Sequence, residues 1–517
     1  MSKTKILWAD DEIEMLRPHI IFLEEKGFEV VAVNSGDDVL EKVAEETFDI
    51  VFLDEQMPGL SGIEVLEKLK DSQPGLPVVM ITKSEEESIM EDAIGSNIAD
   101  YLIKPVKPSQ ILLSLKRNLE NKKLVGEKAT MNYQQEFRDI SMKLQDRLDT
   151  SDWKDIYKKL IRWEIELEKS DDQGISEVLS LQKNEANVGF SKFYSTNYKD
   201  WLYGKTNDKP IQSHTLIKEK VIPQLGKNQK IFFLLIDNLR YDQWKTIEPL
   251  ISNYFRVEED DLYYSILPTT TQYARNALFS GMMPLEIRNR FPNYWVDEQD
   301  EGTKNQYEAE LLGEQFKRYG KQVKYSYNKI LNHEAGKKLL ENLANLMQFD
   351  FNVIVYNFVD MLSHARTEME IIRELADNES AYRSLMASWF EHSSLFEIIK
   401  YLATKNVKII ITTDHGSIRV HDPVKILGDK NVNTNLRYKY GKSLAYNKKE
   451  VFEILQPEEY FLPKLNVSTR WVFTRNNNFF AYPNNYNYYV KFYSNTFQHG
   501  GISLEEVLIP FITLNAK

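Results

Sequence analysis

Apolar and polar residues alternate over the first 120 residues in the way expected of strands separated by helices. Five apolar runs predict strands: KILWADDE, FEVVAVN, DIVFLDEQMPG, PVVMITK and ADYLIKP. The stretch at residues 13–26 predicts a helix that ends at Gly27, and helical patterns fill the other gaps. Strands this apolar, alternating with helices, indicate a parallel sheet covered on both faces. Residues 1–120 are therefore expected to form a doubly wound α/β domain.

Polar side chains stand where these predicted strands end. Asp10 and Asp11 follow the first strand, Asp54 the third, Thr82 the fourth and Lys104 the fifth. In an open α/β sheet, functional groups gather at the carboxyl ends of the strands. Three carboxylates that meet there would repel one another unless a divalent cation joined them, and Mg²⁺ suits oxygen ligands. The alternative is that the five residues are unrelated, in which case their matching positions at the strand ends would be a coincidence.

The segments LDEQMPGLSG and YLIKPV, with the strand-end residues, resemble the receiver domain of two-component response regulators over residues 3–120. The resemblance implies that Asp54 accepts a phosphoryl group and binds Mg²⁺ together with Asp10 and Asp11. It also implies contacts from Thr82 and Lys104 to the phosphoryl group, an aromatic switch at Tyr101 and a cis peptide before Pro105. The added charge at Asp54 would bias a nearby surface, usually from the fourth helix to the fifth, which often dimerises.

Residues 121–205 are helical and polar in pattern and predict a helical-bundle connector. A helix that begins near SDWKDIYKKLIRW has Ser151 and Asp152 as expected N-caps. Its core-facing stripe is Trp153, Ile156, Tyr157, Leu160, Ile161 and Trp163. No short helix pair with a basic recognition helix is evident, so an ordinary DNA-binding transcription factor is not favoured.

In residues 206–517, four segments have an acid or a histidine just after an apolar run. IFFLLIDNLRYD delivers Asp237, FNVIVYNFVDMLSHA delivers Asp360 and His364, VKIIITTDHGS delivers Asp414 and His415, and NTFQHGG delivers His499. Each segment alone is weak evidence, since an Asp after a strand commonly forms a turn. Together they predict a metal site. The other histidines are expected to have ordinary surface or core roles: His19, His214, His333, His392 and His421. Of these, His421 is the main candidate for a further ligand, because it lies six residues beyond His415.

This order of motifs, with the threonine cluster in YYSILPTTTQYARNALFSG, resembles the alkaline phosphatase superfamily, in particular the PglZ-type domain, over residues 228–517. The resemblance implies an alkaline-phosphatase-like α/β fold and two zinc ions. One zinc would be held by Asp360, His364 and His499, and the other by Asp237, Asp414 and His415. Zinc accepts this mixture of imidazole and carboxylate.

Three threonines compete for the role of nucleophile: Thr269, Thr270 and Thr271. The superfamily pattern places the nucleophile three residues after the proline, here Pro268, and ten before the glycine that ends the next helix, here Gly281. Both counts select Thr271, bridging the metals at a helix N-terminus, where a phosphate is favoured. Thr269 and Thr270 are then a strand-end and a capping residue.

The expected substrate is a phosphodiester, since threonine nucleophiles are typical of phosphodiesterases in this superfamily. Between Pro423 and Glu450, seven Lys and Arg residues stand against two acids, and tyrosines are interleaved: Tyr438, Tyr440 and Tyr446. This segment suits a nucleotide or oligonucleotide, or is a solvated basic loop. The aromatic stretch NNNFFAYPNNYNYYVKFYSNTF is interpreted as an edge hairpin. Arg240 is a candidate phosphate contact or a member of an ion pair.

Composition narrows the picture further. The chain has 517 residues, a net charge of −12, 42% hydrophobic residues and no cysteine. Disulfides and zinc fingers are therefore excluded, and any metal must use His, Asp, Glu or hydroxyl ligands. The N-terminus turns acidic where a signal peptide stays apolar, and the run IFFLLI is too short to span a bilayer. We expect a cytoplasmic, soluble protein without membrane insertion.

The complete order of receiver, helical connector and PglZ-type domain resembles response regulators tied to the type IX secretion system. The resemblance implies a sensor histidine kinase partner, a phosphorylation-linked homodimer and a zinc phosphodiesterase acting on oligonucleotides. The alternative is a non-catalytic adaptor that binds a sigma factor or a secretion component. The full set of ligands and a nucleophile favours the enzyme, because an adaptor needs neither.

Overall fold

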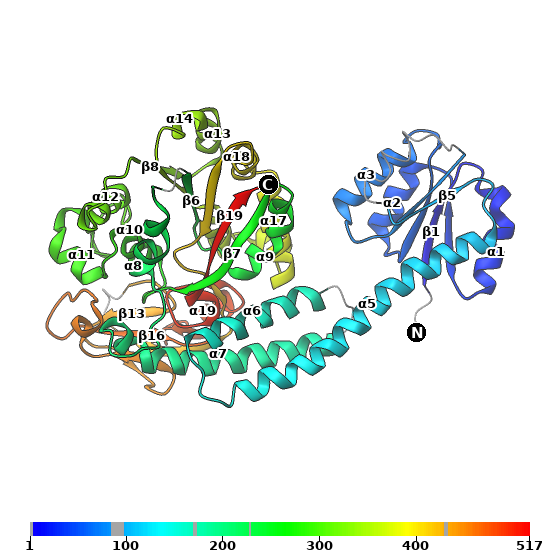
Figure 1. Ribbon diagram of the computed structural model, residues 1–517. Coiled ribbons are helices and arrows are strands. Elements are labelled where there is room, and N and C mark those ends of the chain that lie inside the picture. Colours follow the sequence, from blue (N-terminus) through cyan, green and yellow to red (C-terminus); the bar gives the residue numbers. More distant parts are fainter. Residues whose placement is uncertain (1–3, 84–97, 169–172, 227–228, 429–432) are drawn as a thin grey trace. The chain divides into compact units, whose positions relative to one another are not determined.

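The computed structural model describes residues 4–83, 98–168, 173–226, 229–428 and 433–517 (Figure 1). These residues form two compact units. The first contains the described residues up to 134, and the second contains residues 135–168 together with those from 173 onward. The sequence predicted three domains with boundaries at 120 and 205. In the structure most of the helical connector belongs to the same unit as the C-terminal domain.

The first unit is built on the predicted five-stranded sheet, in which every neighbouring pair is parallel and the order is β2-β1-β3-β4-β5. Its strands are β1 Lys5–Ala9, β2 Glu29–Val33, β3 Ile50–Asp54, β4 Val78–Thr82 and β5 Asp100–Ile103. Its described helices are η1 Ile13–Leu16, α1 Arg17–Glu25, α2 Gly36–Glu45, α3 Gly62–Ser72 and the first part of α5 Pro108–Lys143. The predicted helical pattern between β4 and β5 falls at residues 84–97, outside the described residues.

Both faces of this sheet are covered, as the apolar runs predicted. On β1, Leu7 and Ala9 join a core with residues of α2 and α3, whereas Ile6 and Trp8 join a second core with residues of α1 and α5. The helix predicted at 13–26 is divided in two, because Pro18 occupies the first turn of α1, where its missing N–H is tolerated.

Three helices make up the connector: α5, α6 Thr150–Leu167 and α7 Gln173–Leu202. The predicted stripe on α6 is buried throughout, with Trp153 packed on Phe190 of α7 and Tyr157 on Tyr241. The predicted N-caps are wrong by two or three positions. Asp149 caps α6 by accepting hydrogen bonds from the backbone N–H groups of Ser151 and Asp152.

The second unit is centred on a six-stranded sheet of order β7-β19-β10-β6-β9-β8 (Figure 1). The strands are β6 Lys230–Ile236, β7 Phe255–Tyr264, β8 Tyr325–Ile330, β9 Phe351–Tyr356, β10 Val407–Thr412 and β19 Leu508–Ala516. The four strands β10, β6, β9 and β8 are parallel, while β19 is antiparallel to both β10 and β7. The carboxyl ends of β6, β9 and β10 therefore lie along one edge.

Helices cover both faces of the large sheet. One core joins β6, β9 and β10 to residues of α8 Ser213–Leu216, η2 Ile217–Val221, α10 Asn276–Ser280 and α12 Glu308–Arg318. Helix α9 Tyr241–Ser252 contacts β7, β19, α6 and α17 Glu379–Glu391. The remaining helices of this part of the chain are η3 Ile222–Gln224, η4 Thr271–Arg275, α11 Pro284–Arg290, η5 Pro292–Tyr294, α13 His333–Glu341, α14 Leu343–Leu346, α15 Phe358–Glu368, α16 Glu370–Leu375, α18 Ser394–Ala403, η6 Pro457–Tyr460, α19 Tyr486–Tyr493 and α20 Leu504–Val507.

Small sheets follow β10 in the chain. Their strands are β11 Ile418–Arg419, β12 Asp422–Leu427, β13 Tyr438–Gly441, β14 Ala445–Tyr446, β15 Val451–Ile454, β16 Arg470–Thr474, β17 Asn478–Ala481 and β18 Phe497–Gln498. Our interpretation of the aromatic stretch as an edge hairpin is wrong for the second half of that stretch. After β17 the chain forms α19, so the tyrosines stand at helical spacing.

Among the described residues, none of the helices combines the length and the apolar character needed to cross a membrane.

Candidate functional sites

The first candidate site lies at the carboxyl ends of β1, β3 and β5 in the first unit. Ligand atoms of Asp10, Asp11 and Asp54 lie within 4.8 Å of one another. Lys104 Nζ is 2.8 Å from Asp10 Oδ2 and 3.0 Å from Asp54 Oδ1. Burial raises the pKa of Asp54 to about 6, with the neighbouring acids adding to the effect and Lys104 opposing it. An oxygen-only donor set that repels itself in this way fits a hard cation such as Mg²⁺.

The other predicted receiver residues lie on neighbouring strands. Thr82 ends β4, is buried, and donates a hydrogen bond from its hydroxyl to Glu55. Tyr101 lies on β5 and is half-buried. The peptide bond between Lys104 and Pro105 is cis.

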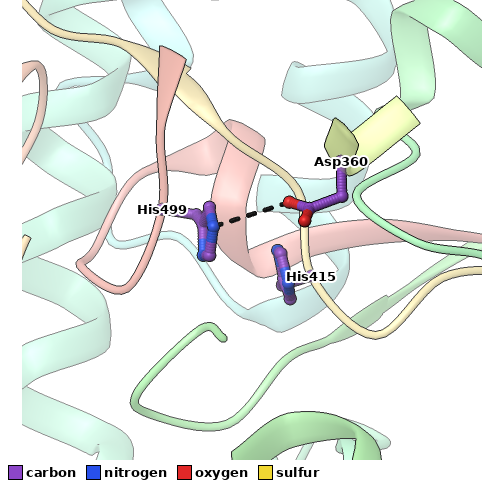
Figure 2. Close-up of side chains that lie close together, drawn as sticks. All are labelled: Asp360, His415 and His499. Carbon is purple, nitrogen blue, oxygen red and sulfur yellow. Dashed lines mark ion pairs between the residues drawn. The ribbon is translucent and has the colours of Figure 1, made fainter. Parts of the chain in front are cut away.

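The second candidate site lies at the shared edge of β6, β9 and β10. Asp237 directly follows β6, Asp360 is in the first turn of α15 after β9, and Asp414 and His415 follow β10. His499 follows β18. Figure 2 shows the side chains of Asp360, His415 and His499 converging, although they come from three different segments. The parallel sheet brings these segments together because its strands end at one edge.

Two groups of ligand atoms share His415. One is Asp360, His415 and His499, the other is Asp237, Asp414 and His415, and within each group the ligand atoms lie within 4.8 Å of one another. His499 Nε2 is 3.7 Å from Asp360 Oδ1, and His415 Nε2 is 3.6 Å from Asp237 Oδ1. The rings of His415 and His499 are stacked, with centroids 4.2 Å apart.

His364 lies at the margin of this arrangement. The sequence prediction grouped it with Asp360 and His499, and α15 does place it four residues after Asp360 on one helix face. Its Nε2 is 3.6 Å from Asp360 Oδ2, but its side chain is 62% exposed. The structure brings His415 rather than His364 into the group with Asp360 and His499.

Thr271 stands between the two groups. Its Oγ1 is 3.0 Å from His415 Nε2 and 3.4 Å from Asp237 Oδ1. It is the first residue of η4, which continues as α10 and ends at Gly281 in the left-handed conformation, as the sequence predicted. Thr269 exchanges hydrogen bonds with Gly500 and Gly501, while Thr270 occupies the N-cap position without a capping bond from its side chain.

Backbone carbonyls orient both imidazoles. His415 Nδ1 is 3.2 Å from the Gly416 carbonyl, and His499 Nδ1 is 3.3 Å from the Thr269 carbonyl. Because a carbonyl only accepts, each Nδ1 carries the proton and each Nε2 presents a lone pair to the site. Burial, with His415 nearby, lowers the pKa of His499 to about 3, so its imidazole is neutral, as a metal ligand requires.

Two residues that sequence reasoning missed hold the carboxylates in place. The Arg275 guanidinium donates from Nε to Asp414 Oδ2 at 3.0 Å and is paired with Asp237 Oδ2. Burial would raise the pKa of Asp414, but Arg275 and His415 lower it. Asn238 has a φ of 63° and donates from Nδ2 to Asp360 Oδ1 at 3.3 Å. The available signals were the position of Arg275 one turn after Thr271 and the tolerance of Asn for positive φ.

Arg240 does not reach the site. Its guanidinium is buried, donates from Nε to Asp242 Oδ1 at 2.9 Å and pairs with Glu379 at 2.5 Å. It is absent from the residues that line the cleft at Thr271. Of the two roles predicted for Arg240, the ion pair describes its contacts, although the pair is buried rather than on the surface.

The predicted basic and aromatic segment is divided: Lys425, Lys442, Lys448 and Lys449 are exposed, whereas the stretch from Arg437 to Tyr440 is buried. Arg437 is buried against Glu506, and Lys439 is buried with its Nζ 2.6 Å from the Asn433 carbonyl. Tyr438 and Tyr440 are buried and stack on Trp471. These side chains serve the core of the small sheets, so the description as a solvated loop and the description as a nucleic-acid surface both fail for them.

The cleft above the second site has a volume of about 690 Å³. Thr271, Asp360, His364 and His499 lie in its lining, together with Thr270, Gln272, Glu298, Lys304, Asn305, Thr367, Glu368, Thr434, Asn435, Leu436, Tyr438, Phe492, Tyr493 and Gln498. His421 lies outside both ligand groups. Three carboxylates, imidazole nitrogens and a hydroxyl fit zinc, which accepts nitrogen and oxygen ligands together.

Comparisons with known proteins agree with this organisation. Residues 6–116 match a response regulator receiver domain, residues 123–202 match the PorX response regulator linker domain, and residues 216–514 match the BREX system PglZ alkaline phosphatase-like domain.

Two curated relatives each match less than a quarter of this chain. The transcriptional regulatory protein ResD of Bacillus subtilis is 31% identical over 22% of this chain and 48% of its own length. AlgB of Pseudomonas syringae, an alginate biosynthesis transcriptional regulatory protein, is 33% identical over 24% of this chain and 28% of its own. A receiver domain structure from Clostridium thermocellum is 30% identical, with a TM-score of 0.23, and covers 24% of this chain and 98% of that one. The chain therefore spans less than half the length of these curated relatives.

The PglZ match covers more than half of the chain, so the chain belongs to the PglZ alkaline phosphatase-like family, within which its receiver and linker give it the organisation of a PorX-type response regulator.

Proposed function

We propose that the second unit is a zinc-dependent phosphodiesterase that acts on nucleotides or oligonucleotides and is controlled by phosphorylation of Asp54. The observation that carries this proposal is the position of the Thr271 hydroxyl, 3.0 Å from His415 Nε2, where the two ligand groups share that histidine. A nucleophile at the junction of two metal-ligand sets is what an in-line displacement at phosphorus requires.

The chemistry follows from the placement of the side chains. Without zinc, His415 Nε2 accepts a hydrogen bond from the Thr271 hydroxyl, because its Nδ1 faces a carbonyl. The same Nε2 lone pair would bind zinc when the metal is present. Thr271 Oγ1 loses its proton to water and bonds to phosphorus while the bond to the leaving oxygen breaks, and that oxygen departs as an alcohol after taking a proton from water. Water then hydrolyses the resulting threonyl phosphodiester, which returns a proton to Oγ1 and releases a phosphomonoester. The helix that begins at Thr271 directs its positive end toward the phosphate. When bound, two zinc ions would lower the pKa of the hydroxyl and neutralise the leaving oxygen.

Replacement of Thr271 by Val tests this proposal, because valine keeps the shape and removes the hydroxyl. The zinc-loaded wild type should hydrolyse a chromogenic phosphodiester, and Thr271→Val should lose at least about a thousandfold in rate while binding the same amount of zinc. Undiminished turnover by Thr271→Val would eliminate Thr271 as nucleophile. A zinc-loaded wild type that cleaves no diester would favour the adaptor that binds a sigma factor or a secretion component.

The receiver supports the regulatory half of the proposal. The Asp10, Asp11, Asp54 and Lys104 arrangement suits Mg²⁺-dependent transfer of a phosphoryl group to Asp54 from a sensor histidine kinase. A small acyl phosphate with Mg²⁺ should label the wild type but not Asp54→Asn, and removal of Mg²⁺ should stop labelling. In the cell we expect this switch to act on type IX secretion, the process that the resemblance of the whole domain order implies.

A further inference from the structure

Helix α19 lies beside the cleft, and the proposed phosphodiesterase mechanism gives it no role. Five of its eight residues are aromatic, in the sequence YNYYVKFY. Tyr488 is 64% exposed and Tyr489 is 39% exposed, and no residue of the helix is buried. Aromatic rings usually contribute large buried areas to a fold. A short surface helix that keeps several of them accessible to solvent therefore has rings available for a ligand.

The rings are ordered along the helix toward the catalytic cleft. Residues four apart face the same way, so Tyr488 pairs with Phe492 and Tyr489 pairs with Tyr493. In both pairs the ring centroids are 6.2 Å apart, and the planes differ by 15° and 12°. Phe492 and Tyr493 line the cleft that contains Thr271. Two columns of nearly parallel rings thus extend from the exposed start of α19 to the reaction site.

The charge around α19 favours a polyanion. The 45 residues from 460 to 504 contain no Asp or Glu, although the chain has 77 acids in 517 residues and about seven would be expected in a segment of that length. The same segment carries the cations Arg475 and Lys491, together with Lys464 and Arg470, which are paired with Glu458 and Glu453 outside it. From outside it, the Arg373 guanidinium lies 5.5 Å from the centroid of the Phe492 ring.

Elsewhere the cleft lining includes Glu298 and Glu368, so a phosphate backbone meets less repulsion along α19 than beside those acids.

We propose that α19 is a stacking platform for the bases of a single-stranded oligonucleotide whose scissile phosphodiester lies at Thr271. Every base has a π face, so rings of this kind bind without reading sequence, and nearby cations bind the phosphates. This inference rests on the proposed phosphodiesterase and names the part of the chain that selects an oligonucleotide over a small diester.

The test measures binding in the absence of turnover, in the full chain loaded with zinc and carrying Thr271→Val. The probes are a fluorescein-labelled ten-nucleotide oligoadenylate and an abasic oligomer of the same length, with Kd obtained from fluorescence anisotropy. The Thr271→Val parent should bind oligoadenylate at least about fivefold more tightly than the abasic oligomer, since stacking on one ring contributes that much or more. Adding Tyr488→Ala and Tyr489→Ala should reduce that difference severalfold, because only Phe492 and Tyr493 of the four rings remain.

Two control variants separate stacking from other effects. Tyr488→Phe with Tyr489→Phe keeps the rings and should keep the difference between the two probes. Tyr203→Ala removes a tyrosine that is 45% exposed and lies outside the cleft lining, and it should also leave the difference intact. Circular dichroism and thermal unfolding should match among all variants, since the replaced side chains are exposed.

The platform is refuted if the parent binds both oligomers equally, or if the alanine pair retains the parent's full preference for bases. Because binding is measured without hydrolysis, a failure of the wild type to cleave any diester would count against the proposed function separately. Cleavage of diesters together with equal binding of the two probes would remove only the platform.

Discussion

Arg275 shows how one side chain can organise a metal-ligand set without touching a substrate. It is fully buried, and its guanidinium contacts one carboxylate oxygen of Asp414 and one of Asp237. The other oxygen of Asp237 faces His415 Nε2 at 3.6 Å and Thr271 Oγ1 at 3.4 Å. The planar fork of an arginine therefore fixes which oxygens remain for a cation.

We predict that Arg275→Gln destabilises the metal-free protein by about 3–5 kcal/mol, because two buried carboxylates lose their counter-charge. The loss should be clearly smaller with zinc present, since a cation would replace part of the missing charge. Urea unfolding with a chelator and with zinc measures both values. Arg275→Lys keeps the charge without the fork and should fall between wild type and Arg275→Gln. Equal losses with and without zinc would show that Arg275 stabilises the fold independently of a metal site.

The buried His214, which lies outside both candidate sites, should make the stability of the fold depend on pH. Burial, with Lys209 and Lys218 nearby, lowers the pKa of His214 to about 3 from its ordinary value of 6.5. Between these values the unfolded chain binds the proton more readily, so this contribution to stability is complete above pH 6.5 and is lost as the pH falls toward 3. The slope approaches about 1.4 kcal/mol per pH unit. His214→Gln should flatten it.

The measurement is the difference in unfolding free energy between wild type and His214→Gln from pH 7 to pH 4. Other titrating groups are common to both proteins and largely cancel in the difference. A difference that stays constant over this range would mean that His214 is protonated equally well in the folded and unfolded chains.

At this scale the predictable residues are those that end a strand. Asp237, Asp414 and His415 follow apolar runs whose parallel arrangement can be anticipated, so their convergence could be expected before the structure. Arg275 and Asn238 could not be assigned in this way. Their contacts depend on side-chain directions set by tertiary packing, and a helical arginine or a turn asparagine has many ordinary roles.

Among the elements, α6 and α7 are attached to the rest of the second unit by buried charge as well as apolar packing. Lys183 Nζ on α7 is 2.6 Å from Glu164 Oε2 on α6, and Arg383 on α17 is 3.2 Å from Glu164 Oε1. Arg383 also lies 2.8 Å from Asp242 on α9. Burial opposes the charge on Glu164, but Lys183 and Arg383 outweigh it and lower the pKa of Glu164 to about 2.

We predict that Lys183→Met destabilises the protein by about 3–5 kcal/mol, because Glu164 loses a buried partner. A control in the same connector is Lys143→Met at the end of α5, which removes an ion pair to Asp152 of α6 in which the two side chains are 47% and 34% exposed. That exposed pair should contribute less than about 1 kcal/mol. Adding Glu164→Gln to Lys183→Met should recover part of the loss in urea unfolding. Similar losses for the Lys183 and Lys143 variants would contradict this account of the junction.

Periodicity predicted the elements well where one face is buried and poorly where it is not. The α6 stripe from Trp153 to Trp163 packs against neighbouring helices, and its burial followed directly from its spacing. Helix α19 was mistaken for a strand because aromatic residues are typical of strands. Its packed face is Tyr486, Val490 and Tyr493, and aromatic residues also occupy its exposed positions, so the spacing of apolar residues does not identify a helix. The N-cap of α6 was misplaced because Asp149, Ser151 and Asp152 are all acceptable caps, and only the backbone geometry selects Asp149.

For the whole molecule, the central question is how a phosphoryl group on Asp54 alters a second unit. The connector offers a means through self-association. On α7, Val178, Leu181 and Val188 are 36%, 69% and 56% exposed and lie on one helix face by their spacing. Exposed apolar residues aligned in this way are typical of a surface that another chain covers. We expect phosphorylation at Asp54 to shift the protein from monomer to dimer and this face to contribute to the contact.

Light scattering of the full chain, with Mg²⁺ and with or without an acyl phosphate, checks this expectation. The molecular mass should double for the phosphorylated wild type and stay unchanged for Asp54→Asn. Leu181→Glu with Val188→Glu should keep the phosphorylated protein monomeric, because two charges would be desolvated in the contact. Val467→Glu replaces a valine that is 91% exposed elsewhere and should dimerise normally. If phosphorylated Leu181→Glu/Val188→Glu still doubled in mass, dimers would form through another surface. If phosphorylated wild type kept its monomer mass, control by dimerisation would be wrong, and the phosphoryl group would have to act within a single chain.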